Sequence, residues 1–186
     1  MPDEIRILGI AGSLRKESFN RYALRAATEL VPAGASLDIF DRLGEFPPFN
    51  QDQDQSPPQV VVDLKAAIRA HDAILFVTPE YNYSLPGLLK NAIDWASRPY
   101  GDSAWAGKPA AVMGASIGRI GTARAQYHLR QCFVFLDMPT VNQPEVMIGS
   151  AKEAFDAAGR LTNESSKKLI GQLLAALVAL TRRVRG

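Results

Sequence analysis

Short apolar runs alternate with helix-like segments along the chain, and this alternation limits the fold more than any other feature of the sequence. The runs have the length of strands buried on both faces of a parallel sheet. Strands are expected at residues 5–10, 35–40, 73–78, 109–115 and 140–147, and helices at 19–31, 60–70, 85–97, 122–136 and 163–183. Such alternation predicts an α/β fold, a doubly wound parallel sheet with helices on both faces and the strand order 2-1-3-4-5.

Length and composition indicate one globular domain over residues 1–186. Hydrophobic residues make up 47% of the chain and charged residues 22%, which is ordinary for a globular protein. The longest apolar tract, residues 173–180, is too short to span a bilayer, and no signal peptide is expected. The single cysteine, Cys132, excludes an internal disulfide and favours a cytoplasmic location. A net charge of +2 gives no argument for nucleic acid.

The turn after the first strand has the composition of an anion site. Residues 9–20 read GIAGSLRKESFN, a glycine- and serine-containing turn that leads into a helix. The first amides of a helix have no partners within it, and its positive dipole end favours a phosphate. Ser13, Ser18 and Asn20 add neutral donors, and Arg15 adds a charged one. An ordinary turn in which Ser18 caps the helix is the alternative.

The same turn does not match the common nucleotide motifs. It lacks the Gly-Lys-Ser/Thr of a P-loop, and Gly9 and Gly12 have the wrong spacing for G-x-G-x-x-G. However, Asp41 ends the second strand, as an acidic residue does in dinucleotide-binding folds. A dinucleotide fold therefore stays open on this segment alone.

Two further turns are rich in polar and aromatic residues, and they follow the third and fourth strands. In residues 79–84, PEYNYS, two tyrosines flank Asn82, which suits a flat ring rich in heteroatoms; a surface turn covering the next helix is the alternative. After the fourth strand come Ser116 and Gly118, and the glycine permits close backbone approach. Because the carboxyl ends of parallel strands share one edge, all three turns are expected to form one ligand site.

Other segments give local expectations. The connector 41–59 is either a packed flap or a mobile loop. Ser84 and Thr162 are the expected caps of the third and last helices, and Cys132 is expected to be buried in the fourth helix. The two histidines, His71 and His128, have no metal-ligand spacing and are expected to be structural.

Three segments together resemble the NAD(P)H-dependent FMN reductases, and within them the bacterial chromate and quinone reductases. The matching residues are 12–20 (GSLRKESFN), 79–95 (PEYNYSLPGLLKNAIDW), and Arg130-Gln131 with Pro144-Glu145. The resemblance extends from Ile5 to Glu145. It implies a flavodoxin-like three-layer sandwich that binds FMN without a covalent bond.

The resemblance also implies which residues hold the cofactor. The phosphate site of the family corresponds to Ser13, Arg15, Ser18, Phe19 and Asn20. Its contacts to the flavin ring correspond to Pro79, Glu80, Tyr81, Asn82 and Tyr83, with the Asn82 backbone amide near flavin N5. Its third binding turn corresponds to Ser116 and Gly118. In the chromate reductases an Arg-x-x-Tyr pair joins subunits beside the flavin. That pair corresponds to Arg124 and Tyr127, with Glu145 as partner, and Arg119 is a further candidate for substrate contact.

The function implied is reduction of quinones or chromate by NADH or NADPH in a ping-pong reaction at the flavin, with no protein nucleophile and no metal. A homodimer or homotetramer without nucleic-acid or membrane partners is expected. Two other functions stay open. A flavodoxin-type electron carrier usually has a strongly acidic surface, so the charge of +2 counts against it. A dinucleotide-binding enzyme without flavin is the third.

Overall fold

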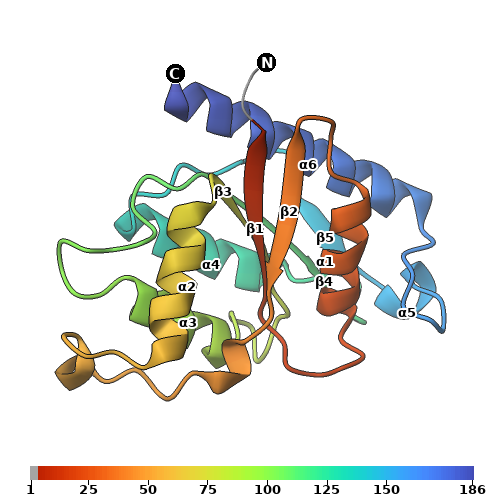
Figure 1. The fold of residues 1–186 in the computed structure, drawn as a ribbon. Helices are drawn as coiled ribbons and strands as arrows, with labels where there is room; N and C mark the ends of the chain where they lie inside the picture. Colours follow the sequence, from red (N-terminus) through yellow and green to blue (C-terminus); the bar gives the residue numbers. More distant parts are fainter. Residues whose placement is uncertain (1–3) are drawn as a thin grey trace.

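The computed structural model describes residues 4–186, and at its centre lies a five-stranded parallel sheet with the order β2-β1-β3-β4-β5 (Figure 1). The strands are β1 (Ile5–Ala11), β2 (Ala35–Phe40), β3 (Ala73–Val77), β4 (Ala110–Ala115) and β5 (Val146–Ile148). All four neighbouring pairs run parallel. The expected sheet and its strand order are confirmed.

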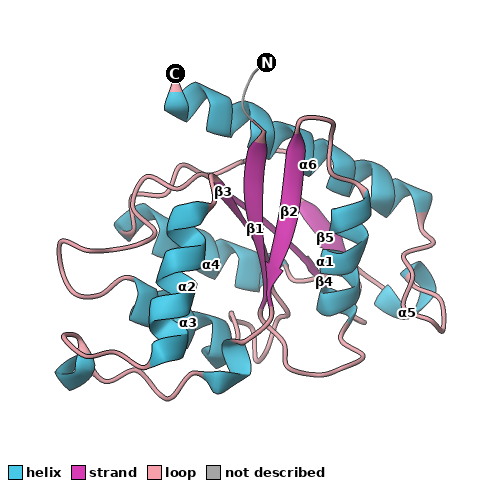
Figure 2. Ribbon diagram, in the orientation of Figure 1, coloured by secondary structure: helices cyan, strands magenta, loops and turns pink. Residues whose placement is uncertain are grey.

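Helices cover both faces of this sheet, which gives the expected three-layer, flavodoxin-like arrangement (Figure 2). The helices are α1 (Phe19–Glu29), α2 (Gln59–Ala70), α3 (Gly87–Ala96), α4 (Ala123–Phe135), α5 (Ala151–Ala154) and α6 (Glu164–Arg185). Two short 3₁₀ turns, η1 (Leu43–Glu45) and η2 (Gln51–Gln53), lie in the connector between β2 and α2. One core contains α2, α3 and α4, and the other contains α1 and α6.

The apolar runs form strands because each strand buries side chains on both faces of the sheet. In β1, Ile5 and Ile7 pack against the α1 and α6 layer, whereas Leu8 and Ile10 pack against α2, α3 and α4. Successive side chains of a strand point to opposite faces, so a strand covered on both sides needs apolar residues at every position. This double burial is why the sequence pattern located the strands.

The fifth strand and two helix starts differ from the sequence expectation. β5 covers only Val146–Ile148, because Thr140 makes a single isolated bridge to Ala110 before the chain leaves the sheet. Pro86, and not Ser84, precedes the first residue of α3. Asn163 caps α6 in place of Thr162, since its side chain accepts the amide hydrogen of Ser166 at 2.9 Å.

The prediction that Cys132 is buried is wrong, because the residue is half-buried at the side of α4. The face of α4 that packs on the core contains Ala125, Leu129 and Phe133, four residues apart. Beyond Phe133, Val134 and Phe135 point away from the core and are 84% and 77% exposed. α4 therefore has apolar residues on its outer face as well, which the sequence pattern alone did not distinguish.

The connector 41–59 is packed against α3, which settles one of the two alternatives left open by the sequence. The carbonyl of Pro47 accepts hydrogen bonds from the Asn91 amide and from the Trp95 indole, both at 2.9 Å. The side-chain oxygen of Asn91 also accepts the amide hydrogen of Phe49 at 2.7 Å. These bonds fix the centre of the connector.

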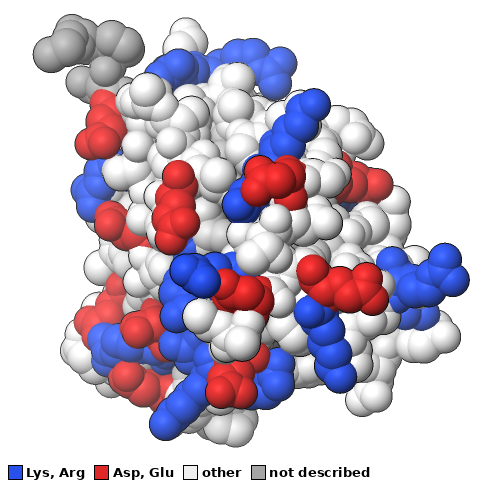
Figure 3. All heavy atoms as spheres, turned by 90° about the vertical axis from the view of Figure 1, so that its right-hand side faces the viewer, with Lys and Arg blue, Asp and Glu red and all other residues white. Residues whose placement is uncertain are grey.

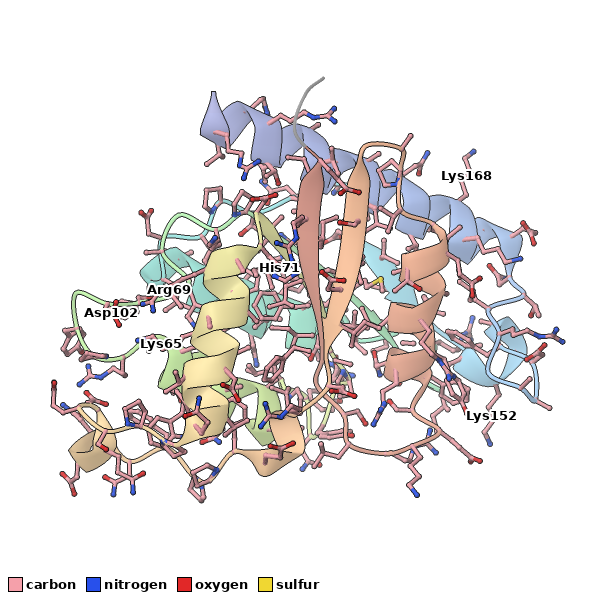
Figure 4. All side chains as sticks on the ribbon, viewed as in Figure 1. Lys65, Arg69, His71, Asp102, Lys152 and Lys168 are labelled. Carbon is pink, nitrogen blue, oxygen red and sulfur yellow. The ribbon has the colours of Figure 1, made fainter. Side chains whose placement is uncertain are left out.

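An ionic cluster joins α2 to the segment after α3 (Figure 4). The ammonium group of Lys65 donates to Asp102 Oδ2 at 2.6 Å and to the Arg98 carbonyl at 2.5 Å, and its side chain is only 7% exposed. Arg69 donates to the other carboxylate oxygen at 2.6 Å. The hydrogen bonds from Lys65 and Arg69 lower the pKa of Asp102. These cations have partners within the chain and are not candidates for ligand binding.

Within residues 4–186, none of the helices combines the length and the apolar character needed to cross a membrane.

Candidate functional site

Three loops follow β1, β3 and β4, and because the strands are parallel the loops lie at one edge of the sheet, the lower edge in Figure 1. We call them the first loop (residues 12–18), the second loop (78–86) and the third loop (116–122). The first loop lies directly against the second. Ser13 Oγ lies 3.4 Å from the hydroxyl of Tyr81. At Gly12 the two loops are so close that an added Cβ would lie 3.0 Å from Pro86 Cγ.

The first loop presents hydrogen-bond donors at the start of α1. Ser18 caps α1 by accepting the amide hydrogen of Asn20 at 3.3 Å, and the first turn of α1 contains no acidic residue. Among residues 4–186, no protein acceptor is bonded to the amides of Leu14, Arg15 and Lys16. Backbone donors at the positive end of a helix form an anion site.

Asn20 fastens the first loop to the end of β4. Its side-chain nitrogen donates to the Ala115 carbonyl at 2.9 Å, and its side-chain oxygen accepts the Ala115 amide hydrogen at 2.8 Å. The residue is 3% exposed. The amide expected to bind phosphate is thus already engaged with backbone. The role that the structure gives Asn20 is to position the loop.

The second loop is a tight two-residue turn. Tyr81 and Ser84 exchange two backbone hydrogen bonds of 3.0 Å, and between them Asn82 and Tyr83 have φ values of 50° and 69°. Consecutive left-handed residues form a type I′ turn, which costs about 1–2 kcal/mol for a residue such as tyrosine. The turn leaves Tyr81 52% and Tyr83 69% exposed. Strained backbone with exposed aromatic rings is a pattern of binding loops.

Glu80 supports the second loop through α4. Its Oε2 accepts the amide hydrogens of Arg124 and Ala125 at 3.0 and 3.2 Å, which supplies the cap that the Thr122 side chain does not provide. Its Oε1 forms an ion pair with the Arg124 guanidinium, and the hydrogen bond to Glu80 raises the pKa of Arg124. The guanidinium carbon also lies 3.6 Å from the centre of the Tyr83 ring. The carboxylate is directed to α4, and the expected cofactor contact of Glu80 stays a prediction.

The third loop is held from behind by a segment that sequence reasoning missed. Gly118 donates its amide hydrogen to Ser116 Oγ at 3.1 Å, and its carbonyl accepts the amide hydrogen of Ser150 at 3.2 Å. A Cβ on Gly149 would lie 2.3 Å from the Arg119 carbonyl oxygen, so only glycine permits this approach. The Gly149-Ser150 pair is a turn signal that marks this segment in the sequence.

The four residues expected at a substrate or subunit contact lie at or near the third loop and α4. Arg119 is exposed in the third loop. The Tyr127 hydroxyl donates to Glu145 at 3.0 Å, and this bond raises the pKa of Tyr127. Arg124 is paired with Glu80 of its own chain. The expected partner Glu145 therefore contacts Tyr127 and not Arg124 within one chain.

The histidines have structural contacts. His71 is buried, with Nδ1 2.7 Å from the Ala67 carbonyl and Nε2 3.0 Å from Asp38 (Figure 4). His128 Nδ1 lies 2.9 Å from the hydroxyl of Ser84. In the described part of the chain, no group of three or more His, Cys, Asp or Glu side chains is placed to hold a metal ion.

Comparison with known proteins gives consistent matches over the length of the chain. The family model described as NADPH-dependent FMN reductase matches residues 5–179. An NAD(P)H-dependent FMN reductase of Pseudomonas aeruginosa is 55% identical over the whole of both chains. A 2-hydroxy-1,4-benzoquinone reductase of Burkholderia sp. is 43% identical, covering 96% of this chain and 97% of the relative. Among solved structures, the flavoenzyme NAD(P)H:(acceptor) oxidoreductase FerB of Paracoccus denitrificans superimposes with a TM-score of 0.88 at 37% identity, covering 96% of this chain and 98% of FerB.

Proposed function

This chain belongs to the NADPH-dependent FMN reductase family, and on that basis we propose that it binds FMN at the three loops and uses NADPH or NADH to reduce quinones. The observation that supports this most strongly is the joining of the loops. Ser13 meets Tyr81, and Asn20 is bonded twice to Ala115, so segments far apart in the sequence form one rim.

The donor set of the rim suits FMN. The first loop offers unbonded amides, the hydroxyl of Ser13 and the charge of Arg15 to a phosphate. The second loop offers exposed tyrosine rings, and we assign the Asn82 backbone amide to the flavin ring. Glu80, the acid in this segment, is held at α4, so it does not repel an anion. In this assignment Phe19 and Pro79 border the phosphate and ring positions.

FMN held at this rim would supply two-electron chemistry, namely hydride transfer from the nicotinamide to flavin N5 and, in a second half-reaction, transfer of the electrons to an oxidant, which is a ping-pong scheme. The residues of the chain orient the cofactor. The rigid turn at Asn82 holds an amide donor, and on the other side Ser116 offers a hydroxyl while Gly118, which has no side chain, permits close approach. No side chain of this rim is required as nucleophile.

The surface beside the rim suits flat, uncharged oxidants and also small anions. Exposed apolar groups, including Tyr83 and Ile117, match a quinone ring. Arg119 supplies a positive charge for chromate, which we propose as a further oxidant. Because these groups lie on an open surface, the enzyme is expected to accept several oxidants.

We assign the outer face of α4 to a contact between copies of this chain, in a homodimer or homotetramer. Tyr127, Val134 and Phe135 on this helix are 52%, 84% and 77% exposed. A helix face of this kind is typical of subunit interfaces. We further propose that residues 1–186 act as one domain in a reducing cytoplasm, as the single cysteine suggests.

The decisive experiment uses the purified protein loaded with FMN. Under anaerobic conditions, NADPH or NADH should bleach the visible flavin band, and added benzoquinone should restore it. Steady-state double-reciprocal plots should give parallel lines. A protein that binds FMN but is not reduced by either nicotinamide would contradict the enzyme function and favour an electron carrier. A protein that takes up no FMN would contradict the site.

A further inference from the structure

A cavity lies beside the first loop, on the side of β2, and the proposed FMN site does not use it. Its volume is about 290 Å³, and the first loop, α1 and the end of β2 line it. Ligand pockets for whole drug-sized molecules have about 300–1,000 Å³, so this cavity suits one fragment of a larger ligand. Ser13 contributes to both the cavity and the loop rim, so a ligand can extend from one into the other.

Three cations line this cavity: Lys16, Arg21 and Arg25. Within residues 4–186, none of them has a carboxylate within 4.0 Å, and the Arg25 guanidinium lies over the Tyr22 ring, with 4.7 Å from its carbon to the ring centre. Arg21 and Arg25 are four residues apart on α1, where like charges repel each other. A bound anion between them would relieve that repulsion.

This concentration of positive charge is local. Figure 3 views the molecule from the side of α1 and α5, and its Lys and Arg side chains are interspersed with Asp and Glu. The face as a whole therefore does not act as a basic surface for a polyanion, and the cations of the cavity call for a small anionic group.

The other cavity walls match a nucleoside. Leu14 and Ile39 are 54% and 41% exposed beside the buried Phe40, which gives an apolar wall for a flat base. Asp41, exposed directly after β2, is the acid of this lining, and because three cations face it the lining carries a net positive charge. A bare phosphate ion would not use the apolar wall.

We infer that this cavity binds the adenosine 2′-phosphate end of NADPH and gives the enzyme a preference for NADPH over NADH. In this arrangement Arg21, Arg25 and Lys16 contact the 2′-phosphate and the apolar wall contacts the adenine. The inference rests on the proposed function, because it takes the nicotinamide to lie at the rim.

The test measures binding of adenosine 2′-phosphate to the FMN-loaded protein by calorimetry, with inorganic phosphate and adenosine as separate probes. Adenosine 2′-phosphate should bind more tightly than either probe. In Arg21→Gln its Kd should rise about tenfold, the loss of one charge-assisted contact, and Arg21→Lys should keep part of the affinity. Arg183→Gln is the matched control, since Arg183 is an exposed cation at the far end of α6, and its Kd should be unchanged.

Steady-state kinetics give the second readout. In Arg21→Gln the KM for NADPH should rise by the same factor, while the KM for NADH and kcat stay unchanged. The inference is overturned if adenosine 2′-phosphate does not bind, if inorganic phosphate binds equally well, if Arg183→Gln weakens binding as much, or if both nicotinamides are affected alike. If adenosine 2′-phosphate binds as expected but neither nicotinamide reduces the flavin, the proposed function fails, whereas the adenosine 2′-phosphate site stands.

Discussion

Replacing Asn20 with alanine tests whether a single buried amide assembles the rim. Asn20→Ala removes both hydrogen bonds to the backbone of Ala115. Ala115 is only 3% exposed, so its amide and carbonyl are then buried without these partners. A buried polar group without a partner costs about 1–3 kcal/mol. Two such groups, partly relieved by water, give an expected loss of about 2–4 kcal/mol in the free energy of unfolding. For a chain of this size that lowers Tm by about 5–15 °C, and the variant should still fold because domains have about 5–15 kcal/mol of stability.

The same substitution should also weaken FMN binding, because the first loop is no longer fastened to β4. Urea unfolding of the protein without FMN measures the first effect, and quenching of FMN fluorescence on binding measures the second. Asn91→Ala is the matched control, since Asn91 makes the same pair of bonds to Phe49 and Pro47 in the connector. It should reduce stability with little effect on FMN affinity. The reasoning is refuted if Asn20→Ala binds FMN normally, or if Asn91→Ala loses FMN affinity to the same extent.

Three further predictions follow from the site and the surface. Arg15→Ala should raise the Kd for FMN about tenfold through loss of one charge-assisted contact; an unchanged Kd in a fluorescence titration would remove Arg15 from the phosphate site. Because Lys65 and Arg69 lower the pKa of Asp102, its carboxylate stabilises the fold above its ordinary pKa of about 3.9, and this stabilisation is lost as pH falls through the lowered value. Asp102→Asn should therefore reduce stability at neutral pH and flatten the acid limb of a Tm-against-pH curve, and an unaltered acid limb would contradict the assignment. Phe135→Asp on the outer face of α4 should shift the sedimentation coefficient toward that of a monomer, and an unchanged coefficient would exclude this face from the interface.

The sequence predicted most of the sheet because burial on both faces leaves a local pattern. Residues 73–78 are apolar up to the last position, and β3 is Ala73–Val77 with every residue buried. The expected fifth strand, residues 140–147, is longer than the observed one. Its composition is strand-like throughout, whereas pairing with β4 begins only at Val146. The limits of a strand depend on where hydrogen bonds to the neighbouring strand begin and end. The composition of the strand itself does not determine these limits.

Sequence alone determined which loops carry the candidate site, since glycine, serine, asparagine and tyrosine after parallel strands are a local and readable signal. Tertiary structure decided what each side chain does there. Asn20 bonds to a residue 95 positions away, and Glu80 caps a helix 44 positions away, so neither was recognised as a support. Cations of the first loop and α1 line one cavity together with Asp41 because β2 pairs with β1 in the folded sheet. Periodicity reports which face of an element is buried, and only the folded chain brings the partners of polar groups together.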